Sequence, residues 1–87
     1  MSLVQVKNVI TDDISAWMLY SRTIATIMSN RMAQLGMTQK ALAIKMNCSQ
    51  QYVSKVLKGR ENLSLETLCK IEKALDVNIL MSNIKIE

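Results

Sequence analysis

The chain has 87 residues, of which 49% are hydrophobic and 21% charged, and it carries a formal net charge of +4 at pH 7. These values favour one small folded domain and exclude a disordered chain. No apolar run approaches the roughly 18 residues that a membrane span needs, because charged side chains interrupt every candidate. Nothing at the N-terminus has the pattern of a secretion leader, so we expect a cytoplasmic protein without a membrane partner.

The composition also argues against an enzyme and against a metal site. The sequence has no histidine, and its two cysteines, Cys48 and Cys69, lack CxxC spacing. This leaves no zinc site and no Ser-His or Cys-His pair, and the carboxylates form no recognisable catalytic constellation. We therefore predict a binding protein with no cofactor and no metal, in which both cysteines are small buried residues.

The first predicted helix begins near Thr11 or Asp12 and runs to Gly36, with a possible break near Ser21. Proline is absent from the chain and glycine occurs twice, so little interrupts helical structure. The apolar stripe of this helix is expected to contain Ile14, Trp17, Ile24, Met28, Met32 and Leu35.

A short second helix is predicted up to Met46. Thr38 is its expected N-terminal cap, and Leu42, Ala43 and Met46 form its inner face. Asn47 is expected to end it, because asparagine tolerates a left-handed backbone better than most residues.

The third predicted helix is capped by Ser49 and closed by Gly59, and it has two different faces. At 100° per residue, the packing face contains Tyr52, Val53, Val56 and Leu57. The opposite face contains Gln50, Gln51, Ser54, Lys55 and Lys58. Glutamine can bond adenine N6 and N7, and lysine can reach guanine or phosphate, so this face suits the major groove of DNA.

A fourth helix is predicted from Ser64 or Leu65 to Leu75, and it is expected to bury Leu65, Leu68, Ile71 and Leu75. Cys69 lies at the edge of that stripe.

The positive charge is concentrated in the segment before the fourth helix. Residues 36–60 contain five basic side chains and no acidic one, whereas the rest of the chain has six basic and seven acidic residues. Such a concentration is typical of a phosphate-binding surface, and a merely solvated lysine-rich face is the alternative.

Residues 38–59, TQKALAIKMNCSQQYVSKVLKG, resemble the helix-turn-helix of the Cro and phage-repressor family, also called the xenobiotic-response-element family. Asn47 stands where the family usually has glycine. Residues 63–77, LSLETLCKIEKALDV, are similar to the helix that follows the motif, and the whole resemblance covers about residues 24–78. The positions that match within the motif are Thr38, Gln39, Leu42, Ala43, Val53 and Val56.

The resemblance implies an all-α, lambda-repressor-like domain of four to five helices that binds operator DNA, usually as a dimer. The residues it assigns to base reading are Gln50, Gln51 and Lys55. The residues it assigns to the DNA backbone are Gln39, Lys40, Ser49, Ser54, Lys58, Arg60 and Asn62. The alternatives are that Lys40, Lys58 and Arg60 are only solvated and that Asn62 helps to cap the next helix.

One pair of positions departs from the family pattern. The family commonly has an arginine and a glutamate, forming a partly buried ion pair, where this chain has Met32 and Leu57. Both partners are apolar here, so no charge is stranded. We expect Met32 and Leu57 to touch each other or to share a neighbour.

The chain divides into an N-terminal extension (residues 1–20) that forms part of a long first helix, a helix-turn-helix domain (21–78) and a C-terminal apolar segment (79–87). Alternating apolar residues hint at short strands near residues 4–6 and 84–86. Both ends are rich in apolar side chains, so we predict a homodimer that uses one or both of them. The alternatives are that both ends fold onto their own domain or that a C-terminal continuation of the chain covers them.

Together these features predict a sequence-specific transcriptional regulator, a repressor, that reads the major groove of double-stranded DNA with the helix at residues 49–58. The alternative is an antitoxin, which binds a toxin protein and regulates its own expression through the same domain. An enzyme is a distant third, because catalytic groups are missing.

Overall fold

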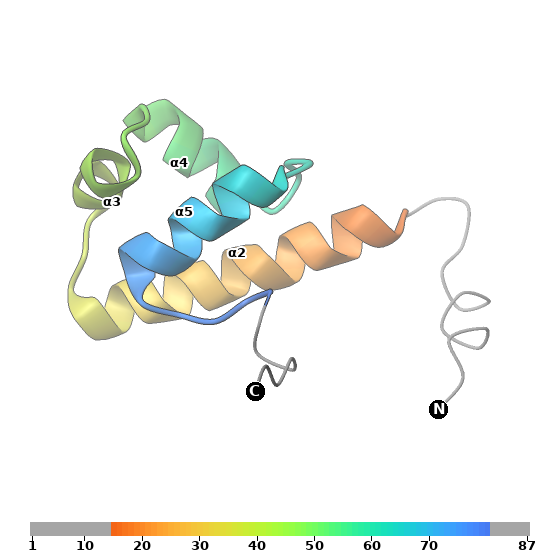
Figure 1. Cartoon of the computed structure of the whole chain (residues 1–87), viewed down its shortest axis with the longest axis horizontal. Helices are drawn as coiled ribbons and strands as arrows, with labels where there is room; N and C mark the ends of the chain where they lie inside the picture. The colour runs from red at the N-terminus through yellow and green to blue at the C-terminus, as the bar shows by residue number, and fades with distance from the viewer. Residues whose placement is uncertain (1–14, 81–87) are drawn as a thin grey trace.

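The computed structural model describes residues 15–80, which form four helices (Figure 1). In chain order these are α2 (Ala16–Leu35), α3 (Gln39–Met46), α4 (Gln50–Leu57) and α5 (Leu65–Leu75). No strand occurs between residues 15 and 80, so this part of the chain is all-α, as predicted. The strands expected near residues 4–6 and 84–86 lie outside the described residues.

The long helix α2 is the support on which the other helices are arranged. Both α4 and α5 pack against α2, while α3 packs against α4 and α5. After α5 the chain returns toward the middle of α2 (Figure 1). Within residues 15–80, no helix is long and apolar enough to cross a membrane.

Helix α2 starts later than predicted and is not broken. Ser15 has an extended backbone with ψ 157°, so α2 begins at Ala16 rather than near residue 11 or 12. The helix continues through Ser21 to Leu35, and Gly36, at φ 62°, ends it in the left-handed conformation as expected.

The core is one apolar cluster to which all four helices contribute. Leu42, Ala43 and Met46 are buried, which confirms the predicted inner face of α3. Ala43 is small enough to let α3 approach its neighbours closely. The other buried members are Ile24, Met28, Met32, Val53, Val56, Leu68, Ile71, Ala74 and Leu75.

Three residues expected in the core are exposed instead. Trp17 and Leu35 are 40% and 44% exposed. Helix α2 has 20 residues and is about 30 Å long, whereas α4 and α5 have 8 and 11 residues. The shorter helices therefore cover only the middle of α2. Leu65 is 70% exposed because it is the first residue of α5, one turn before the packed part begins at Leu68.

The prediction that both cysteines are buried is also wrong. Cys48 is half-buried in the turn between α3 and α4, at the edge of the core, and Cys69 is exposed. Cys69 follows the buried Leu68 by one residue, and a helical step of about 100° turns its side chain toward solvent.

Met32 and Leu57 both pack in the core, while their contact or shared neighbour stays a prediction. Met32 is 7% exposed and belongs to the central cluster. Leu57 is partly buried and packs against the same cluster. Neither apolar side chain is left in solvent.

Candidate nucleic-acid interface

Two short helices joined by a tight turn form the centre of the candidate site. Asn47 ends α3 with φ 56°, in the left-handed conformation predicted for it. The N–H of Cys48 then donates to the carbonyl oxygen of Ala43 at 3.0 Å, which closes the turn. Ser49 begins the next helix, and its hydroxyl oxygen accepts a hydrogen bond from the N–H of Tyr52 at 3.0 Å. These local bonds fix the angle between α3 and α4.

Helix α4 has the two faces that its sequence predicts. Val53 and Val56 are each 1% exposed. Tyr52 and Leu57 are half-buried against the core. On the opposite side Gln50, Gln51, Lys55 and Lys58 are exposed, and Ser54 is half-buried. The valines thus hold α4 in place while its amides and ammonium groups face solvent.

Five of the predicted DNA-contacting residues surround one shallow, open hollow where the N-termini of α3 and α4 meet. We call it the polar hollow, and it is lined by Gln39, Ser49, Gln50, Gln51 and Ser54. Gln39 comes from α3 and the others from α4 or its cap. The structure thus brings together residues of both helices.

The electrostatics of the polar hollow suit an anion. The N-terminus of a helix carries free N–H groups and a partial positive charge. Neither α3 nor α4 has an acidic residue in its first turn, whereas α5 has Glu66 there. Two helix ends without competing carboxylates can therefore receive phosphate oxygens.

The remaining predicted contact residues lie outside the polar hollow. Lys40, Lys55, Lys58 and Arg60 are exposed. Gly59, which separates the last two, has φ 76°, and a Cβ there would lie 3.2 Å from the Cα of Arg22 in α2. Close approach to α2 and the positive φ thus both favour glycine at this position. Asn62 is also exposed, but it lines a different hollow.

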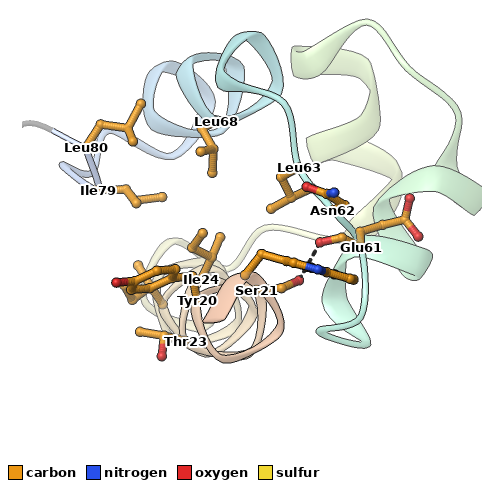
Figure 2. Close-up of a pocket in the computed structure, with 12 residues that line it drawn as sticks. Tyr20, Ser21, Thr23, Ile24, Glu61, Asn62, Leu63, Leu68, Ile79 and Leu80 are labelled. Atoms are coloured by element: carbon orange, nitrogen blue, oxygen red, sulfur yellow. Dashed lines mark hydrogen bonds between the residues drawn. The ribbon is translucent and has the colours of Figure 1, made fainter. Parts of the chain in front are cut away.

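That second hollow is an apolar groove, with a volume of about 590 Å³, beside the first half of α2 (Figure 2). Glu72 shapes one wall, because its carboxylate accepts the N–H groups of Ile79 and Leu80 at 2.6 and 2.7 Å. The lining residues are Trp17, Tyr20, Ser21, Thr23, Ile24, Ile27, Glu61, Asn62, Leu63, Leu68, Ile79 and Leu80. We call this surface the apolar groove.

Sequence reasoning missed the apolar groove, although a signal was present. Trp17, Tyr20 and Ile24 are spaced by three and four residues, which indicates one face of a helix. The predicted core stripe contains Trp17 and Ile24 but not Tyr20. Only Ile24 is buried, while Tyr20 is 67% exposed. The spacing indicates that these side chains share one face of the helix, but it does not show that part of this face is open to solvent.

A further basic cluster is separate from both surfaces. Lys45 of α3 and Lys70 and Lys73 of α5 line a small hollow between these helices. Lys70 is paired with Glu66, at 3.8 Å between Nζ and Oε2. Among residues 15–80, no three His, Cys, Asp or Glu side chains gather as metal ligands would.

A capped helix, a tight turn and a second helix with an outward polar face define a helix-turn-helix DNA-binding domain. A family model described as helix-turn-helix matches residues 27–80, which is more than half of the chain. The chain therefore belongs to the lambda-repressor-like helix-turn-helix family, a family of DNA-binding regulators rather than of enzymes. No curated protein and no solved structure matches the chain significantly.

Proposed function

We propose that this protein is a sequence-specific transcriptional repressor that reads operator DNA by inserting α4 into the major groove. The observation that supports this proposal is the polar hollow. It joins the exposed amides of α4 to two helix N-termini that have no acidic residue in their first turns. This combination can hold a phosphate and present hydrogen-bonding groups to a base pair at the same time.

In this proposal, three side chains of α4 read the bases. The amides of Gln50 and Gln51 can each donate to and accept from one adenine edge, and the ammonium group of Lys55 can donate to guanine O6 and N7. All three side chains are exposed, and α4 is held by buried valines, so the reading groups start from a rigid support.

The DNA backbone is contacted by the residues around these three. Gln39 and the first-turn N–H groups face a phosphate from the N-terminus of α3, and the other contacts come from the ends of α4 and the loop after it. The proposed backbone contacts are Gln39, Lys40, Ser49, Ser54, Lys58, Arg60 and Asn62.

Selection of bound sequences from a random pool of duplex DNA tests this proposal. We expect one enriched motif, and we expect the double variant Gln50→Ala/Gln51→Ala to lose the enrichment while keeping its thermal stability. Lys70→Ala/Lys73→Ala is the control, because these exposed lysines belong to the separate cluster between α3 and α5. A pool with no enriched motif would contradict sequence-specific binding.

We further propose that two copies associate through the apolar groove. A recognition helix of eight residues reads only a few base pairs, so useful specificity favours two copies about one DNA turn apart. Trp17 and Tyr20 are exposed at the groove. Among the described residues that line it, Glu61 alone is charged, and its carboxylate lies near Lys55. A nearly uncharged apolar face can meet its own copy without like-charge repulsion.

Light scattering of the intact chain tests the homodimer. Tyr20→Ser should shift the population toward monomers, whereas Ile44→Ser should not, because Ile44 is 72% exposed and does not line the groove. A further chain lacking residues 78–87 tests the C-terminal segment, of which Ile79 and Leu80 line the groove. An intact chain that is monomeric at high micromolar concentration would contradict the homodimer.

The alternative function is that of an antitoxin that also regulates its own expression. The apolar groove favours this candidate, because it is a second surface, lined largely by residues outside the motif. Co-expression with the product of a neighbouring gene should then give a stable binary complex that Tyr20→Ser weakens. If no binary complex forms, the antitoxin role is contradicted and the repressor remains the one proposed function. Either role requires access to operator DNA, so the proposal includes a cytoplasmic location.

A further inference from the structure

Glu61, in the loop between α4 and α5, has its main chain fixed by α2. The hydroxyl of Ser21 donates to the carbonyl oxygen of Glu61 at 2.7 Å, a bond that spans 40 residues of sequence (Figure 2). Ser21 is 3% exposed, and it is the one buried polar residue within residues 15–80. This hydrogen bond is partly buried, and its loss would leave the carbonyl oxygen of Glu61 without this donor, which costs free energy. The bond therefore holds the loop in place against α2.

The carboxylate of Glu61 points away from the apolar groove (Figure 2). Its Oε1 atom lies 3.9 Å from Nζ of Lys55. The side chain of Glu61 is 26% exposed and that of Lys55 is 66% exposed, so the lysine is the freer partner. A pair this exposed adds little to stability, and its effect is on the position and charge of Lys55.

A carboxylate at this place has two consequences for DNA binding. Residues 36–60 contain no acidic side chain, so Glu61 brings a negative charge to the edge of an otherwise basic segment. First, it limits the directions in which the flexible Lys55 can reach a phosphate. Second, it competes with phosphate for the ammonium group of Lys55. On a non-preferred sequence Lys55 can gain a phosphate only by leaving Glu61, whereas on the preferred sequence it can donate to a base while it stays paired.

We propose that Glu61 is a positioning residue that sets the sequence specificity of Lys55 and weakens binding to non-preferred DNA, while Ser21 fixes the loop that carries it. This inference rests on the proposed function, since it assumes that Lys55 reads a base. In this inference, the discrimination between preferred and non-preferred DNA depends on an acidic side chain that need not touch the DNA itself.

The test is the variant Glu61→Gln, which keeps the side-chain size and the main-chain bond to Ser21. Binding is measured on the selected site and on a scrambled duplex over a range of salt concentrations. We expect affinity for the scrambled duplex to rise about fivefold and affinity for the selected site to change by less than about twofold. The log-log salt slope on the scrambled duplex should steepen by about one, as Lys55 gains a phosphate.

Glu66→Gln is the matched control. Glu66 also pairs with a lysine, Lys70, at 3.8 Å, so its loss changes the net charge equally at another place. It should leave the ratio of the two affinities unchanged. In a Lys55→Ala background, Glu61→Gln should no longer alter that ratio. Ser21→Ala, like Glu61→Gln, should lower the ratio of the affinity for the selected site to the affinity for the scrambled duplex.

Two results would overturn the inference: equal changes on both duplexes in Glu61→Gln, or an undiminished effect of Glu61→Gln in the Lys55→Ala background. Failure of the unaltered chain to prefer any sequence would instead contradict the proposed function. Thermal melting of each variant establishes that it is folded before binding is compared.

Discussion

Arg31 of α2 donates a hydrogen bond from Nε to the carbonyl oxygen of Leu75, the last residue of α5, at 2.8 Å. Carbonyl groups at the end of a helix lack a partner within the helix, so a charged donor satisfies one of them. The next residue, Asp76, has φ 54°, and its carboxylate lies 3.9 Å from Nη2 of Arg31. Two helices that are distant in sequence are thereby joined at the C-terminus of α5.

We expect Arg31→Ala to lower the free energy of unfolding by about 1 to 2 kcal/mol, because it removes a charged donor from a helix terminus. Asp76→Asn is the control. The Asp76 side chain is 97% exposed, and asparagine also tolerates the left-handed backbone, so no measurable loss is expected. Urea denaturation measures both variants. Equal losses would show that the exposed ion pair, and not the bond to the helix end, is what matters.

Leu57→Glu should destabilise the domain by about 2 to 4 kcal/mol, because a carboxylate would enter the core without a partner. Leu57→Met keeps the apolar volume and should have little effect. In the double variant Met32→Arg/Leu57→Glu, part of the lost stability should return, since the arginine supplies the missing charge. Thermal denaturation compares the three proteins. Full stability of Leu57→Glu alone would mean that this side chain can turn to solvent.

Features that depend on neighbouring residues could be predicted from the sequence. Thr38 and Ser49 cap their helices through bonds to residues three positions later, and Asn47 ends α3 by its own backbone preference. The inward face of α4 also follows from periodicity, because successive side chains turn by about 100°.

Features that depend on where packing partners end could not be predicted in this way. Trp17 and Leu65 follow the apolar period of their helices but are exposed, because the neighbouring elements do not reach them. Periodicity gives the direction of a side chain and not the extent of its cover. The importance of Glu61 likewise depends on its bond to Ser21, a residue 40 positions away for which no local pattern exists.

Single substitutions of Gln50, Gln51 or Lys55 by alanine should each cost about 1 to 3 kcal/mol on the preferred DNA site and much less on random DNA. The reason is that a base contact is lost only where the matching base is present. Competition between the two duplexes measures the difference. Equal losses on both would reassign the residue to the DNA backbone.

The salt dependence of binding separates charged backbone contacts from neutral ones. Each lysine or arginine that neutralises a phosphate releases counterions, so Lys40→Ala, Lys58→Ala or Arg60→Ala should reduce the log-log slope of affinity against salt by about one. Gln39→Ala should weaken binding to preferred and random DNA alike without changing the slope, because an amide displaces no counterion. Lys73→Ala is the charge-matched control, and its slope should stay that of the unaltered chain, since Lys73 lies in the separate cluster with Lys45 and Lys70. If the affinity of the unaltered chain did not depend on salt concentration, phosphate contacts would be contradicted altogether. If Lys73→Ala reduced the slope as much as the other three substitutions do, overall charge, and not the surface around the polar hollow, would be what attracts the DNA.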